Sequence, residues 1–112
     1  LMRKGRFDEI FFVDLPDAEI RRKVFEIHIE KRGLSSRNFA LDELVAISEG
    51  FTGAEVEQAV VSALYSASAR SESPSMEHIR TAIANTRPLS VIMAEQMNML
   101  RAWAKDRAVA AN

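Results

Sequence analysis

The sequence predicts a mainly α-helical fold that is preceded by one short strand. After residue 17, apolar residues recur at helical spacing in about five segments, which Gly, Ser and Pro residues separate. Ahead of them, Ile10 to Val13 form an unbroken run of β-branched and aromatic residues, which is typical of a strand buried on both faces of a parallel sheet. Because a lone strand cannot satisfy its own hydrogen-bonding ladder, we expect the rest of its sheet to lie outside this chain.

The first predicted helix begins after Asp17, whose side chain can cap it, and ends at Gly33. Ser35 to Asn38 is predicted to be a polar loop, and a short helix follows from Leu41 to about Ser48. The apolar residues that recur at helical spacing in these two helices are expected to face the core: Ile20, Val24, Phe25, Ile27, Leu44, Val45 and Ile47.

The next helix has the clearest start in the sequence. Gly50 ends the short helix, and Thr52 with Glu55 then forms a capping box, in which each side chain satisfies a backbone N–H that the helix leaves unpaired. The apolar face that follows is made mostly of small residues, so a neighbouring helix can approach closely. Its members are Val56, Ala59, Val60, Ala63, Leu64 and Ala67.

Two more helices are predicted after the loop from Ser71 to Ser75. Ser75 can cap the first of them, which carries Ile79, Ala82 and Ile83, and Arg87-Pro88 then breaks the chain. The last helix runs from about Ser90 to Ala108. One face carries Met93, Met97, Leu100 and Ala104, with Trp103 at its border. We expect this face to pack back on the other helices; the alternative is an adaptable partner surface, for which methionine is well suited.

Composition excludes several classes of function. The chain has 112 residues, a formal net charge of −1 and no cysteine, so it offers no thiolate metal site and no Cys nucleophile, and its charge gives no reason to expect nucleic acid or an anionic membrane as a partner. No apolar run is long enough to span a membrane. We expect a cytoplasmic protein.

The residues present do not form a complete catalytic or nucleotide-binding motif. No Gly-rich loop ends in Gly-Lys-Ser/Thr, so the chain cannot hold a triphosphate by itself. His28 and His78 are far apart in the sequence, which gives no metal-binding spacing, and we expect His78 to be a surface residue. No serine lies in a nucleophile elbow.

Three stretches are candidates for ligand contacts, and each has a plainer explanation. Arg3 and Arg6 flank a glycine just before the strand and suit a phosphate, but on spacing alone a solvated basic turn is the better explanation. The small residues Gly53 and Ala54 let a ligand approach a helix N-terminus, or they simply complete a helix cap. His28 could contact a base or ribose, or be a half-buried residue with a satisfied hydrogen bond.

Taken together, these stretches resemble the AAA ATPases, a family of ring-forming enzymes. Leu1 to Ile10, with Gly-Arg-Phe-Asp at residues 5–8, is similar to the family's second region of homology. Leu15-Pro16-Asp17 and Ile27-His28 also match the family, and Gly50 to Glu55 resembles its sensor-2 signature. The resemblance covers about residues 1–85, and residues 86–112 are similar to the end of certain bacterial and plastid AAA proteins.

The resemblance implies roles for individual residues. Arg6 matches the arginine finger and Arg3 its companion, which reach the γ-phosphate bound by a neighbouring subunit. The residues that match contacts to the adenosine are Val24, His28, Gly53 and Ala54. Ala54 stands where the wider AAA+ superfamily often has an arginine that touches the γ-phosphate, so the resemblance implies that nucleotide is sensed here mainly through the adenosine.

The expected domain organisation follows from the same resemblance. Residues 1–16 would end the ATPase core, residues 17–86 would form a helical AAA+ lid of four to five helices, and residues 87–112 would add a C-terminal helix. The implied cofactor is ATP, with Mg²⁺ held outside this chain; the implied partners are other subunits of a ring, expected to be a hexamer, and a protein substrate. The implied source is bacterial. A catalytically silent AAA scaffold and a helical protein-interaction module remain alternatives.

Overall fold

The computed structural model describes the backbone of residues 15–111 and the side chains of residues 15–106. This part of the chain is helical, as predicted. Its elements in order are α2 (Ala18–Lys31), the 3₁₀ turn η1 (Ser36–Asn38), α3 (Leu41–Ile47), α4 (Gly53–Ala69), α5 (Met76–Ala84) and α6 (Leu89–Ala111). The strand predicted at residues 10–13 lies outside the described residues.

The ends of α2 follow the predicted capping residues. The Asp17 carboxylate accepts a hydrogen bond of 2.9 Å from the backbone N–H of Ile20 at the start of the helix. At the other end, Gly33 adopts a φ of +81°, and the N–H groups of Gly33 and Leu34 donate to the carbonyls of Glu30 and Ile29. A positive φ suits glycine, so Gly33 ends the helix as expected.

Only some of the apolar residues of α2 that were predicted to face the core pack on it: Phe25 is fully buried and Val24 is partly buried against the core cluster. Ile20 and Ile27 are each 53% exposed, whereas Phe25 and Ile29 are fully buried and Arg21 is buried beside them. At 100° per residue, the Ile20, Val24 and Ile27 positions lie roughly 130° around the helix from Phe25. Ile20 and Ile27 therefore lie on a second apolar face, which the described part of the chain covers only in part, at Val24.

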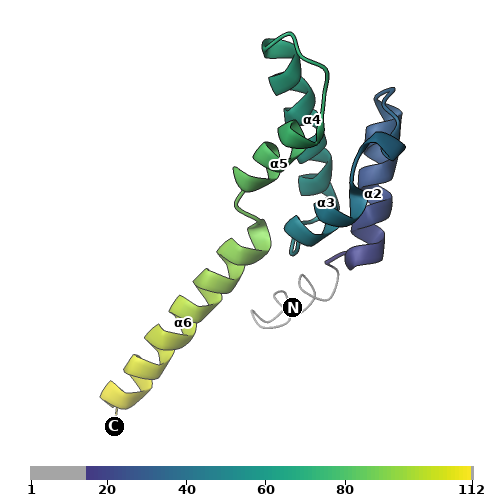
Figure 1. Ribbon diagram of the computed structural model, residues 1–112. Coiled ribbons are helices and arrows are strands. Elements are labelled where there is room, and N and C mark those ends of the chain that lie inside the picture. Colours follow the sequence, from purple (N-terminus) through teal and green to yellow (C-terminus); the bar gives the residue numbers. More distant parts are fainter. Residues whose placement is uncertain (1–14, 112) are drawn as a thin grey trace.

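Helix α4 is the centre of the described bundle. The small apolar face predicted for it is confirmed: every predicted member except the partly buried Leu64 is at most 1% exposed. Helix α4 packs against α2 on one side and α5 on the other, and α3 contacts both α2 and α5. Figure 1 shows these four helices gathered together. The core between them consists of Phe25, Ile29, Phe39, Leu41, Leu44, Phe51, Val56, Ala59, Val60, Ala63, Ile79 and Ile83.

The connection between α2 and α3 is more ordered than a polar loop. Residues 36–38 form η1, and Ser36 is buried, with its hydroxyl donating a 2.6 Å hydrogen bond to Glu30 Oε2. In α3, Leu44 is fully buried as predicted, but Ile47 at the end of the helix is 41% exposed. Gly50 follows with a φ of +84°, which turns the chain toward α4.

Helix α6 does not pack back on the bundle, so the preferred expectation for it is wrong. Figure 1 shows α6 running away from the other helices from its first turns onward. Met99 and Leu100 are 71% and 54% exposed, and the hydrogen bonds that tie α6 to α4 and the turn before it start from its first two residues, Leu89 and Ser90. Among the described residues, no helix combines the length and the apolar character that a membrane crossing needs.

Candidate functional site

The C-terminal half of α2 meets the beginning of α4 through a cluster of polar side chains. Arg32 Nη2 lies 3.6 Å from Glu57 Oε2, and His28 Nδ1 lies 3.8 Å from the same oxygen. Arg32 Nη1 also donates to the His28 backbone carbonyl at 3.2 Å and lies 3.3 Å from His28 Nδ1. Because Glu57 belongs to the second turn of α4, this cluster fixes His28 next to the start of that helix.

The contact with Arg32 indicates which ring nitrogen of His28 carries its proton. Because a guanidinium can only donate, the 3.3 Å contact from Arg32 Nη1 favours the tautomer in which His28 Nδ1 accepts and Nε2 carries the proton. Among the described residues, Nε2 has no hydrogen-bonding partner. The side chain of His28 is 17% exposed, so the ring has restricted access to solvent and one N–H available for a further acceptor.

The backbone of the first turn of α4 is accessible, because the side chains there are small. A Cβ added to Gly53 would meet no atom within 4 Å, and Ala54 is exposed. The N–H groups of these two residues find no acceptor in the described part of the chain, as expected for the first positions of a helix. Small side chains and unpaired N–H groups together allow a polar ligand to approach the helix end.

The structure thus brings several of the predicted adenosine-contacting residues to one side of the bundle. Glu57 joins His28 to the helix that begins with Gly53 and Ala54, and Val24 lies one turn before His28 on α2, partly buried. Arg3 and Arg6, the predicted arginine fingers, lie outside the described residues.

The start of α4 is held by the predicted capping box. The backbone N–H of Glu55 donates to Thr52 Oγ1 at 3.1 Å, and the backbone N–H of Thr52 donates to Glu55 Oε1 at 2.9 Å. These reciprocal bonds fix the turn that carries Gly53 and Ala54. Helix caps of this kind stabilise a protein by about 1 kcal/mol.

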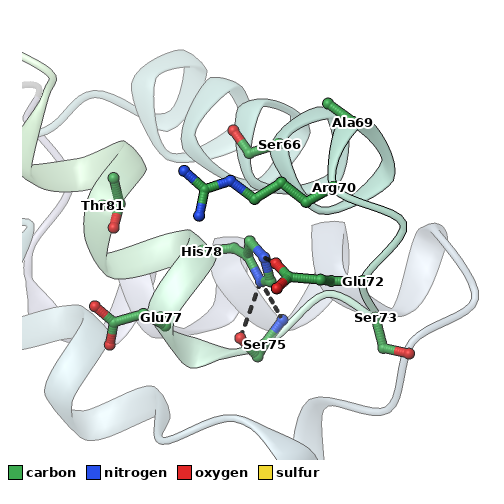
Figure 2. A pocket seen from close by; sticks show the side chains of 9 residues that line it. All are labelled: Ser66, Ala69, Arg70, Glu72, Ser73, Ser75, Glu77, His78 and Thr81. Carbon is green, nitrogen blue, oxygen red and sulfur yellow. Dashed lines mark hydrogen bonds and ion pairs between the residues drawn. The ribbon is translucent and has the colours of Figure 1, made fainter.

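A second capping arrangement lies in a polar hollow of about 610 Å³ at the far end of α4; the cap at Ser75 was predicted, but the part that His78 plays in it was not. Figure 2 shows the His78 ring turned toward Ser75, with Glu72 beside it. The Ser75 backbone N–H donates to His78 Nδ1 at 3.1 Å, and His78 Nε2 lies 3.0 Å from Glu72 Oε1. His78 is therefore not the surface residue we expected, and its side chain is only 14% exposed.

A hydrolytic triad uses the same residue types as Glu72, His78 and Ser75. Here, however, the three side chains are arranged as a helix cap. Ser75 Oγ lies 2.9 Å from His78 Nδ1, which already accepts the Ser75 backbone N–H. One ring lone pair cannot both receive that N–H and act as a strong base for the hydroxyl. The ring occupies the place that Glu or Gln takes in an ordinary capping box, three residues after the capping serine.

Arg21 is the second residue whose role was not predicted from the sequence. Its side chain is buried and donates to two backbone carbonyls, those of Pro16 and Val45, each at 3.1 Å. Pro16 precedes α2, and Val45 lies in the last turn of α3, where a helix end favours a positive charge. Arg21 therefore ties the segment that enters the bundle to α3. Its Nε is buried and has no partner among the described residues.

An ion pair joins α3 to α5. Arg80 donates to both carboxylate oxygens of Glu43, through Nε and through Nη2, and its Nη1 lies 3.0 Å from Glu77. The hydrogen bond from Arg80 holds the pKa of Glu43 below its ordinary value, and the same bond raises the pKa of Arg80. In the described residues, no group of three or more His, Cys, Asp or Glu side chains is placed to hold a metal ion.

Comparison with curated proteins decides the family. The chain is 41% identical over 107 residues to AAA domain-containing protein ycf46 of Pyropia yezoensis, a match that covers 95% of this chain and 22% of that protein. It is 42% identical over 67 residues to the proteasome-activating nucleotidase of Saccharolobus islandicus (strain M.14.25 / Kamchatka #1), covering 60% of this chain and 17% of that protein. The chain belongs to the AAA ATPases.

The remaining comparisons add detail to this AAA assignment. The ycf46 protein of Gracilaria tenuistipitata var. liui is 42% identical over 105 residues, covering 93% of this chain and 21% of that protein. The chain thus spans about a fifth of the length of these curated relatives. No protein-family model matches it, and no solved structure does. These relatives give no support to the expected bacterial source. The helices α2 to α5 are consistent with the lid of an AAA protein.

Proposed function

We propose that these helices form a lid that closes over the adenosine of ATP held by the P-loop core of the whole protein. The observation that carries the proposal is the juxtaposition of His28 with the open start of α4 through Glu57. An adenosine placed there could receive hydrogen bonds from the His28 Nε2–H and from the N–H groups of Gly53 and Ala54. Val24 would add an apolar contact to the base.

The exposed second face of α2 supports the same proposal. Ile20 and Ile27 flank Val24 on this face and are each about half exposed, which is unusual for isoleucines in a small bundle. The face begins five residues after Leu15, where the chain enters the lid. A core domain that closes on the nucleotide would cover it.

Hydrolysis is proposed to involve arginines of a neighbouring subunit in a ring. Arg6 and Arg3 match the finger positions of the family, and a guanidinium stabilises the charge that develops in phosphoryl transfer even when another subunit supplies it. The name of the Saccharolobus relative refers to activation of a proteasome. By analogy with that relative, we propose that ATP hydrolysis drives the remodelling of a protein substrate. The proposed assembly is a hexameric ring, and Mg²⁺ would be bound outside this chain.

The test is ATP turnover by the full-length protein, wild type and Arg6→Ala, alone and mixed in several ratios. We expect the variant to lose about 10³-fold or more in rate and the mixtures to lose activity non-linearly with the fraction of variant. Normal turnover by Arg6→Ala would refute the finger assignment. No turnover by either protein would favour a silent AAA scaffold.

A second candidate function is favoured by the position of α6. The helix extends away from the bundle, and Met99 and Leu100 are largely exposed on it. An adaptable methionine-rich face can recruit a partner protein. If recruitment is the main function, Met97→Glu should abolish partner binding while the ATP turnover of the full-length protein is retained.

A further inference from the structure

The start of α6 is attached to the turn that begins α4 by a single carboxylate. Glu55 Oε1 accepts the Thr52 backbone N–H at 2.9 Å, and Glu55 Oε2 accepts the Leu89 backbone N–H at 2.8 Å. Leu89 is the first residue of α6, and Thr52 caps α4. Glu55 therefore satisfies unpaired N–H groups at the N-termini of two different helices, one on each of its oxygens.

A second contact at the same place is close enough to require a glycine. The Ser90 hydroxyl donates a 2.7 Å hydrogen bond to the Gly50 carbonyl, and Ser90 is only 7% exposed. A Cβ at Gly50 would lie 2.8 Å from Ser90 Oγ, so a larger residue would displace the serine. The base of α6 is thus packed directly on the segment between residues 50 and 55.

Several side chains of α6 are exposed. Val91, Met99 and Leu100 are 42%, 71% and 54% exposed. The 23 residues of α6 span about 35 Å at 1.5 Å per residue. A small change in the orientation of the first turn therefore displaces the distal end of the helix by a much larger distance (Figure 1).

We infer that Glu55 is a positioning residue that couples adenosine contact at Gly53 and Ala54 to the orientation of α6. The inference rests on the proposed function, because it takes the start of α4 as the place where the nucleotide is contacted. Glu55 lies in the first turn of α4 and moves with that turn. The hydrogen bond from the Leu89 N–H to Glu55 Oε2 then moves the first residue of α6 as well. Since coupling of two equilibria is reciprocal, releasing α6 from Glu55 also changes the affinity for nucleotide.

One substitution removes this link without removing the α4 cap. Leu89→Pro deletes the N–H that Glu55 Oε2 accepts, and proline is well tolerated at the first position of a helix. Leu89→Ala is the matched control, because it shortens the same side chain and keeps the N–H. Glu55→Gln is a second variant that retains the size of the side chain but leaves one oxygen to accept both N–H groups.

The readout is the distance between spin labels at Tyr65→Cys on α4 and Met99→Cys on α6 in the full-length protein, after removal of any cysteines outside this chain, with and without saturating ADP. Both positions are more than 70% exposed, and this chain contains no other cysteine. We expect ADP to shift the distance in the otherwise wild-type protein and in Leu89→Ala. In Leu89→Pro and Glu55→Gln we expect a broad distribution that ADP does not shift, and an ADP Kd changed on the order of 5-fold.

The outcomes separate the inference from the function on which it rests. If ADP binds the wild type without shifting the distance, or shifts it equally in Leu89→Ala, Leu89→Pro and Glu55→Gln, the coupling is refuted and the proposed function stands. If ADP does not bind the wild-type protein, the proposed function fails and the coupling fails with it. Circular dichroism of each variant establishes that the helices are intact.

Discussion

The contact between Gly50 and Ser90 gives a quantitative prediction for the stability of this chain. Gly50→Ala places a side chain at a φ of +84°, which costs about 1–2 kcal/mol. The added Cβ would also lie 2.8 Å from Ser90 Oγ and displace its hydrogen bond to the Gly50 carbonyl, a loss of about 0.5–1.5 kcal/mol. The free energy of unfolding should therefore fall by roughly 1.5–3.5 kcal/mol.

The second part of this loss depends on the serine. In a Ser90→Ala background, the nearest neighbour of the new Cβ at residue 50 is the Cβ of residue 90 at 3.9 Å, an ordinary contact. Only the φ penalty then remains, so the double-mutant cycle should give a coupling energy of about 0.5–1.5 kcal/mol. Gly33→Ala is a matched control: Gly33 has a φ of +81° and open space around its Cβ position, so it reports the φ penalty alone.

Urea unfolding followed by circular dichroism would measure all four corners of the cycle. Any entropic gain from replacing glycine in the unfolded chain is common to both backgrounds and cancels. Additivity of Gly50→Ala and Ser90→Ala within about 0.3 kcal/mol would refute the close packing of α6 on this turn.

Three further predictions concern the bundle itself. Phe25→Ala removes a fully buried ring and should lower the free energy of unfolding by about 3–5 kcal/mol, measured by urea unfolding. Arg21→Lys keeps the charge but cannot donate to both backbone carbonyls as the guanidinium does, so a loss of about 1–3 kcal/mol is expected in the same assay, and an unchanged midpoint would contradict this role. Because Arg80 lowers the pKa of Glu43 in the folded chain, the stabilisation by this pair is present above the ordinary glutamate value of 4.5 and is lost as pH falls below it. The thermal midpoint of wild type should therefore exceed that of Glu43→Gln at pH 7 and approach it at acid pH; a difference that does not change with pH would contradict the pKa shift.

Features that depend on neighbours in sequence could be predicted well. The Thr52–Glu55 capping box, the Asp17 cap and the turn at Gly33 each involve residues three or four positions apart, and the structure has all of them. The small apolar face of α4 was predictable because a single helical period describes it. The His78 cap is equally local, and a serine followed three residues later by a hydrogen-bonding side chain was the signal that could have revealed it.

Features that depend on distant residues could not be predicted in this way. Arg21 is buried because one of its acceptors, the Val45 carbonyl, comes from another helix 24 residues away. Ile20 and Ile27 were assigned to the core because periodicity does not distinguish two apolar faces of one helix. The direction of α6 depends on two hydrogen bonds at its base that span 34 and 40 residues.

The candidate site shows the same division. His28, Gly53 and Ala54 were identified through the family resemblance, which supplied roles that spacing alone left open. Their convergence rests on Glu57 and Arg32, which the sequence did not single out because neither belongs to a motif. The residues that would hold the phosphates were predicted to lie outside this chain.

The central claim is that adenosine binds against the first turn of α4, and one comparison tests it directly. Gly53→Val introduces a side chain where the structure has no atom within 4 Å of the Cβ, so the lid should fold normally. Ala69→Val places the same side chain on an exposed position at the other end of α4 and serves as the control. ADP binding by the full-length protein, measured by titration calorimetry, should weaken about tenfold or more in Gly53→Val, a loss of about 1.4 kcal/mol or more, and stay unchanged in Ala69→Val. An ADP Kd that is the same in both variants would contradict the account.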